Sequence, residues 1–334
     1  MSSQTITAPE NIYITELFGS LDSNIRRIEH AFGVNITNRG GDISVSGESD
    51  ENVKAAASVI KSLVRTLQKG EELDDQRLGY LIATGREDLD SLQSAVDLTD
   101  DTVCMTFSGK PIRARTLGQK KYIDLIRKNT VIFSVGPAGT GKTYLSMAMA
   151  VASFKRGEVA RIILTRPAIE AGEKLGFLPG DMQQKVDPYL RPLYDALNDI
   201  MGAETHAKNT EKQAIEVAPL AYMRGRTLDN AFIVLDEAQN TTPEQMKMFL
   251  TRIGYGSKCI ITGDITQIDL PDGKKSGLIE AVKLLKNIEG IGISMLTNKD
   301  VVRHPLVQKI INAYDARDAK IKKAKLLKQE SRGM

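Results

Sequence analysis

Apolar positions recur along this chain with two different periods. Between residues 50 and 67 they fall on one face of a helix, at Val53, Ala57, Ile60 and Val64. From residue 130 onward, short apolar runs alternate with longer segments of helical period. The runs are TVIFSV at 130–135, ARIILT at 160–165, AFIVL at 231–235, KCIIT at 258–262 and IGISML at 291–296. Strands that alternate with helices predict a parallel sheet with helices on both faces.

These patterns divide the chain of 334 residues into successive parts. We predict a small α+β unit at 11–67, an acid-rich connector with some helix at 68–115, an α/β domain at 116–315 and a Lys-rich tail at 316–334. The small unit is expected to contain a strand at 11–17, a helix at 22–32, strands at 34–37 and 42–45, and a helix at 50–67. Ser49 or Asp50 is a candidate cap for this last helix.

Composition narrows the class of protein without identifying it. No stretch approaches the roughly 18 uninterrupted apolar residues of a membrane helix, so we expect a cytoplasmic protein with no membrane partner. The two cysteines, Cys104 and Cys259, lack the spacing of metal ligands. A formal net charge of +3 is close to balance and by itself indicates no nucleic-acid partner.

The string GPAGTGKT at 136–143 follows one of the apolar runs and precedes the helical run YLSMAMAVASF. This is the context of a phosphate-binding loop, in which backbone N–H groups and a helix N-terminus surround the phosphates. Lys142 would place its charge on the phosphates, and Thr143 would offer its hydroxyl to magnesium. The predicted nucleotide-binding residues of the loop are Gly136, Pro137, Ala138, Gly139, Thr140, Gly141, Lys142 and Thr143.

Two adjacent carboxylates end a later strand. Asp236 and Glu237 follow the run at 231–235, and ligands of open α/β sheets bind at the carboxyl ends of strands. We expect Asp236 to hold magnesium through its water shell and Glu237 to act as general base toward the attacking water. Taken alone, such a pair can also simply cap a helix, but together with the phosphate-binding loop it favours nucleotide hydrolysis.

Two glutamines complete the predicted site. Gln267, in GDITQID, follows the run at 258–262, whose end should lie beside that of 231–235, so its amide could reach the γ-phosphate. A surface-loop glutamine is the alternative interpretation. Gln119 precedes the phosphate-binding loop, and an amide can pair with the edge of adenine; this favours ATP as the nucleotide.

Several strings together closely resemble the PhoH-like protein family. They are GPAGTGKT at 136–143, TRPAIEAGEKLGFLPGD at 165–181, RGRTLDNAFIVLDEAQN at 224–240, TGDITQIDLP at 262–271 and VVRHPLVQKI at 301–310. The resemblance implies a RecA-like core, similar to the first motor domain of superfamily 1 RNA helicases. It also implies that the N-terminal unit is KH-like and that RNA is a partner. FGSLDSN at 18–24 departs from the G-x-x-G loop of RNA-binding KH modules.

The part that carries the motor motifs has room for one motor domain, whereas a helicase places two across its nucleotide. We therefore expect a ring of identical subunits, a hexamer, in which a neighbour supplies an arginine to the phosphates. Arg303, in an apolar context, is the first candidate, and Arg166, Arg224 and Arg226 are the others.

The sequence thus predicts a magnesium-dependent ATPase acting in RNA metabolism. The resemblance adds single-stranded RNA, a ribonuclease or the ribosome as partners. Two alternatives stay open at this point. The first is an oligomeric scaffold that ATP orders without essential hydrolysis, and the second is a small-molecule kinase.

Overall fold

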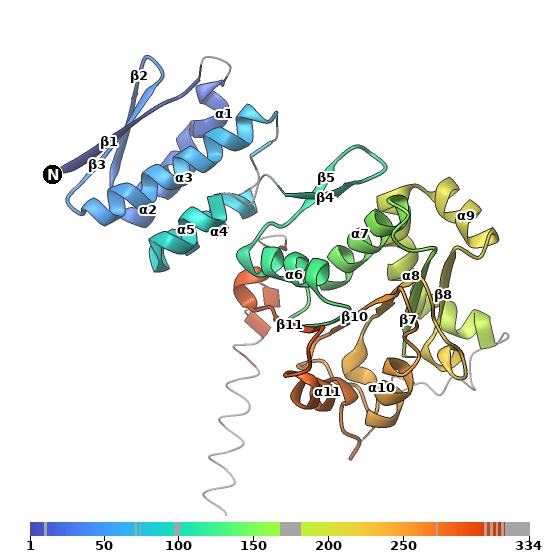
Figure 1. Cartoon of the computed structure of the whole chain (residues 1–334). Helices are drawn as coiled ribbons and strands as arrows, with labels where there is room; N and C mark the ends of the chain where they lie inside the picture. Colours follow the sequence, from blue (N-terminus) through green and yellow to red (C-terminus); the bar gives the residue numbers. More distant parts are fainter. Residues whose placement is uncertain are drawn as a thin grey trace, which may run out of the picture.

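The computed structural model describes residues 1–9, 12–70, 72–73, 75–96, 101–167, 182–271 and 273–303, with 306–307, 310–311, 313–314 and 317 beyond them. Figure 1 shows a smaller N-terminal part beside a larger α/β domain. The predicted Lys-rich tail and most of the motif at 165–181 lie outside the described residues. None of the described helices is both long and apolar enough to cross a bilayer.

The N-terminal part is a three-stranded antiparallel sheet with helices packed against it. Its elements are β1 (Ser2–Thr7), α1 (Ile14–Phe18), α2 (Ser23–Phe32), β2 (Asn35–Arg39), β3 (Asp42–Gly47) and α3 (Asp50–Gln68), and the strand order is β1-β3-β2. The predicted helices and the hairpin are confirmed. Ser49 caps α3 by accepting a hydrogen bond from the backbone N–H of Asn52, as expected.

One expectation for this part is wrong. Residues 11–17 were predicted as a strand, but α1 covers Ile14–Phe18 and the missing strand is β1, at Ser2–Thr7. The isoleucines at positions 12 and 14 alternate with polar residues, which is typical of a strand. Helix α1 has only five residues, too few for a helical period to show in the sequence. Leu17 is fully buried in α1. The partner of β3 is instead a polar segment whose Ile6 alone is buried.

Helices and a short hairpin occupy the predicted connector. They are α4 (Asp75–Glu87), α5 (Leu89–Val96), β4 (Thr102–Met105) and β5 (Pro111–Arg113). Helices α4 and α5 both pack on α3, and Leu78, Leu81 and Leu92 are buried there. Much of the connector therefore extends the N-terminal core, and the helix α6 (Leu117–Lys128) that follows begins the α/β domain.

The α/β domain has a six-stranded parallel sheet in the order β11-β6-β10-β9-β7-β8. Its strands are β6 (Val131–Val135), β7 (Arg161–Arg166), β8 (Ile215–Pro219), β9 (Ala231–Leu235), β10 (Lys258–Gly263) and β11 (Ile291–Met295). The predicted strands are confirmed, and β10 pairs with β9 as expected. The sequence patterns missed β8, an edge strand whose segment IEVAP contains only a short apolar run.

Side chains that alternate along the strands reach two cores, one on each face of the sheet. Ile132, Phe232 and Ile260 face the helices α7 (Lys142–Lys155) and α8 (Met182–Met201), while Phe133, Ile233 and Ile261 face α10 (Pro243–Leu250) and α11 (Gly277–Leu285). Burying each such side chain contributes roughly 1.5–3 kcal/mol. The strand ends are therefore held rigidly, and the site is built on them. Helix α9 (Ala203–Glu211) packs beside α8 and β8.

Candidate functional site

The loop between β6 and α7 is the centre of the site, because its backbone conformation requires glycine. Gly139 and Gly141 have φ of 84° and 78°, in the left-handed region. A Cβ on Gly136 would lie 2.6 Å from the carbonyl oxygen of Leu296, so glycine is required there by the close approach of the chain that follows β11. The loop therefore turns its N–H groups inward, at the N-terminus of the 14-residue helix α7.

Lys142 is buried at the base of this loop. Its Nζ donates to the carbonyl oxygens of Gly136 and Pro137 at 2.6 and 2.7 Å. Burial lowers the pKa of Lys142, and the nearby carboxylates of Asp264, Asp236 and Glu237 oppose that shift. A buried cation beside a loop whose N–H groups can bind an anion is a suitable site for a polyphosphate.

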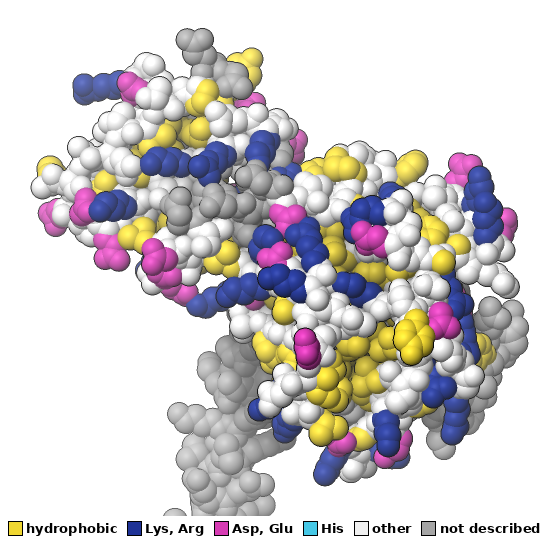
Figure 2. Space-filling view, in the orientation of Figure 1, with side chains coloured by type: hydrophobic (Ala, Val, Ile, Leu, Met, Phe, Trp, Pro, Cys, Tyr) yellow, Lys and Arg dark blue, Asp and Glu magenta, His cyan; other side chains and the backbone are white. Residues whose placement is uncertain are grey.

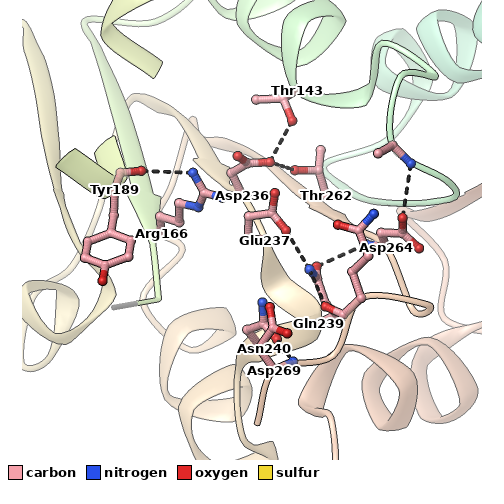
Figure 3. Close-up of polar contacts among 12 residues, drawn as sticks. Thr143, Arg166, Tyr189, Asp236, Glu237, Gln239, Asn240, Thr262, Asp264 and Asp269 are labelled. Carbon is pink, nitrogen blue, oxygen red and sulfur yellow. Dashed lines mark hydrogen bonds and ion pairs between the residues drawn. The ribbon is translucent and has the colours of Figure 1, made fainter. Parts of the chain in front are cut away.

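Thr143 and Asp236 lie where magnesium would be held. The Thr143 hydroxyl donates to Asp236 Oδ1 at 2.7 Å, and the buried Thr262 hydroxyl donates to the same oxygen at 2.6 Å (Figure 3). A hydroxyl and one carboxylate are the sparse protein ligands that Mg²⁺ prefers, because it keeps several waters and takes phosphate oxygens. The donor set therefore fits magnesium, with Thr143 and Asp236 as its predicted holders.

Glu237, the predicted general base, is held between two side chains. Its φ of 52° is left-handed, which costs about 1–3 kcal/mol for a residue with a side chain. Gln239 donates to Glu237 Oε2 at 2.5 Å, and Arg166 at the end of β7 pairs with Oε1 at 3.0 Å (Figure 3). Arg166 also donates to the carbonyl oxygen of Tyr189 at 2.9 Å. Both oxygens of the carboxylate therefore have a partner that holds it at the end of β9.

Gln239 and Asp264 connect the strand ends to the loop, and the sequence patterns missed both. The Gln239 amide donates to the carbonyl oxygen of Gln267 and accepts from the backbone N–H of Asp264 at 3.0 Å each. Asp264 Oδ2 in turn accepts from Ala138 N–H at 3.1 Å. In the sequence, Gln239 stands two residues after Glu237. This spacing indicates a contact between the two side chains only when the left-handed turn at Glu237 is known.

The two predicted glutamines differ in burial. Gln267 follows β10 with an exposed side chain, so its predicted role toward the γ-phosphate stays a prediction. Gln119 is buried; its NH₂ donates to the carbonyl oxygen of Thr140 at 3.1 Å and its Oε1 accepts from Arg115 N–H at 2.8 Å. The amide is therefore engaged with the loop itself, and adenine recognition stays a prediction.

Arg303 lies on the phosphate-binding loop of its own chain. Its Nη2 donates to the carbonyl oxygen of Ala138 at 2.7 Å, and Val302 N–H donates to that of Gly139 at 2.9 Å. This differs from the expected donation by a neighbouring copy. The reason is the sheet order: β11 is the neighbour of β6, so the segment that follows β11 runs across the loop that follows β6.

The other three candidate arginines have different surroundings. Arg226 forms a bidentate pair with Glu216, at 2.6 Å for both contacts, and this pair engages its guanidinium group. Arg224 is exposed on the segment after β8, and Arg166 holds Glu237. Of the candidates, the structure thus brings Arg303 and Arg166 to the site.

A parallel sheet with this loop, buried lysine and paired acids defines a P-loop NTPase. The family model described as PhoH-like protein matches residues 111–315. The chain is 52% identical to a PhoH-like protein of Bacillus subtilis, covering 90% of this chain and 93% of that protein. It is 51% identical to a PhoH-like protein of Mycobacterium bovis (93% and 87%) and 40% identical to Protein PhoH of Escherichia coli (80% and 73%). The chain belongs to the PhoH-like protein family.

Proposed function

We propose that this chain is a magnesium-dependent ATPase that cleaves the γ-phosphate with water. The observation that carries the proposal is the pair of carboxylates at the end of β9. Asp236 is tied to Thr143 of the loop, while Glu237, one residue on, is held by Arg166 and Gln239 and is not engaged with the loop. We assign Asp236 to the metal and Glu237 to the attacking water.

The residues would divide the reaction as follows. The loop N–H groups and Lys142 bind and orient the phosphates, and Arg303 adds a second cation on the loop's rim. Glu237 accepts a proton from the attacking water while Arg166 and Gln239 keep its carboxylate in place. Magnesium, held by Thr143 and Asp236, would neutralise charge on the phosphate oxygens.

We further propose that single-stranded RNA is the polymer on which this ATPase acts. Exposed lysines on and beside α10 and α11 support this part, because lysines bind phosphates and release counterions. They are Lys247, Lys274, Lys275, Lys283 and Lys286. RNA-stimulated turnover, falling as salt rises, is the expected consequence. Action in the cytoplasm beside a ribonuclease or the ribosome belongs to the same proposal.

We also propose that the chain assembles as a ring, a hexamer. The contact of Arg303 with the loop of its own chain changes which arginine a neighbour would supply. With Arg303 on its own loop, a neighbouring copy is no longer needed to supply the first arginine. Arg224, exposed after β8, is then the candidate to reach across an interface. A ring would show as a mass in solution several times the 36.7 kDa of the chain.

A phosphate-release assay with the purified chain tests the function. ATP with magnesium should release phosphate, and EDTA should abolish the release. Single-stranded RNA should raise the rate several-fold at low salt. Phosphate transferred to an acceptor would favour the kinase, and nucleotide binding without any release would favour the scaffold; either result contradicts the proposal. Equal rates with and without RNA would remove the RNA part alone.

A further inference from the structure

A cleft of about 1210 Å³ separates helix α4 from the phosphate-binding loop. One wall is α4, the floor is the loop with the start of α7, and the remaining sides are the segment after β5 and the segment 298–303. Figure 2 shows Lys and Arg side chains at this junction between the two parts of the molecule. Gly139 and Gly141 line the cleft, so it opens directly onto the phosphate-binding loop.

Helix α4 turns one face to the cleft over three turns. Gln76, Tyr80, Ala83, Thr84 and Glu87 line it, and their spacing places them on one side of the helix. This wall is fixed to the α/β domain, because the hydroxyl of Tyr80 accepts the backbone N–H of Leu117 at 2.8 Å. Leu117 begins α6, which also carries Gln119 and its hydrogen bond to the loop.

The direction of a bound nucleotide follows from the loop. Lys142, Thr143 and Asp236 mark the end that holds the β- and γ-phosphates and the metal. Tyr144 and Leu145, the next residues of α7, line the cleft. The ligand atoms beyond the α-phosphate therefore point away from Glu237 and into the space that faces α4.

The cleft carries groups suited to a nucleoside. Tyr80 on α4 and Tyr144 at the start of α7 both line it with half-buried side chains, and the Tyr144 hydroxyl is oriented by its hydrogen bond to Asp199 at 2.6 Å. Arg113 and Arg115 also line the cleft. Aromatic rings and guanidinium groups are the usual stacking partners of a base.

We propose that helix α4 of the N-terminal part forms one wall of the nucleotide site and contacts the nucleoside end of the bound nucleotide. The inference rests on the proposed function and adds that the N-terminal part senses whether a nucleoside is present. A ligand with phosphates only, such as tripolyphosphate, fills the loop without reaching α4.

A tryptophan placed in the cleft tests this directly. Ala83 is exposed and lines the cleft from helix α4, so Ala83→Trp fills the nucleoside space. ADP should bind this full-length variant at least ten-fold more weakly than the wild type, while tripolyphosphate should bind with unchanged affinity. Arg86→Trp is the matched control, because Arg86 is exposed on the same helix outside the cleft. It should leave both affinities unchanged.

Hydrogen exchange gives a second readout on the wild type. ADP should slow the exchange of amides in 75–87, and tripolyphosphate should not. Unchanged ADP affinity in Ala83→Trp, an equal loss for ADP and tripolyphosphate, or α4 amides indifferent to ADP would overturn the proposal. ADP that binds as described to a chain releasing no phosphate would leave this inference standing and defeat the proposed hydrolysis. A wild type that binds neither ligand defeats both.

Discussion

Two of the described loops that precede a helix and contain a glycine with positive φ differ in one respect: only the first has the features of an anion site. The loop at 136–141 leads from β6 into α7; the other, at 19–22, leads from α1 into α2. In the first, Lys142 is buried among loop carbonyls and Arg303 lies over the rim. In the second, Asp22 stands at the helix start and places a negative charge where an anion would bind.

The comparison teaches that glycines and a helix N-terminus are insufficient. Leu21 and Asp22 of the second loop take the left-handed conformation themselves, with φ of 51° and 58°. The first loop is supported on both sides by chain from distant positions, through Asp264 and Val302. A cation, a strand before the loop and supporting segments separate a phosphate site from an ordinary turn.

The largest expected effect comes from removing the buried cation. Lys142→Ala should lower ATP turnover by about 10³, because the phosphates lose their charge partner in a water-poor site. Steady-state phosphate release measures it. Lys142→Arg keeps the charge and should retain more turnover than the alanine variant. Turnover of Lys142→Ala within two-fold of wild type would contradict the statement that the buried cation distinguishes the first loop from the second.

Removing the second cation should have a smaller effect. Arg303→Ala deletes the hydrogen bond to the Ala138 carbonyl oxygen and should lower turnover about 10²-fold, the size expected for one donor to developing charge. Mixing this variant with Glu237→Gln separates action on its own loop from action on a neighbour's. If each chain uses its own Arg303, the mixture stays as inactive as the two variants alone, because every site lacks one of the two groups. Activity above that of either variant would mean that the arginine acts across an interface.

A third change affects the side chain that holds the base. Arg166→Gln removes the ion pair with Glu237 and should lower kcat about ten-fold with KM unchanged, because Arg166 has no contact with the loop. Arg156→Gln is the control; that arginine pairs with Glu158 on the surface, where ion pairs contribute little. A rise in KM without a fall in kcat would assign Arg166 to nucleotide binding instead.

The smallest effect is expected at the second loop. Asp22→Asn removes the acid at the start of α2 and should change ATP turnover and ATP affinity by less than two-fold, because this loop lacks the cation and supports of the first. Titration of ATP binding measures it. A new phosphate-dependent site at α2 in this variant would show that the acid alone distinguishes the loops.

Much of the α/β domain could be predicted from sequence, because its central strands are largely buried apolar runs and its loop is a contiguous motif. The placement of Arg303 could not, since Arg303 and Ala138 are 165 positions apart and meet only through the β11–β6 pairing. The roles of Gln239 and Arg166 depend on the left-handed turn at Glu237. The strand β1 was missed because its alternation is nearly all polar.

The proposed hydrolysis of ATP depends most on Glu237, the base that activates water. Glu237→Gln keeps the size of the side chain and should lower phosphate release by about 10²–10⁴. ATP affinity, measured on the same preparation by equilibrium titration, should stay within three-fold of wild type, because the hydrogen bond and the ion pair of Glu237 are with Gln239 and Arg166. This combination, binding without turnover, is the predicted result. Phosphate release at the wild-type rate would contradict the assignment of Glu237 and with it the proposed hydrolytic mechanism.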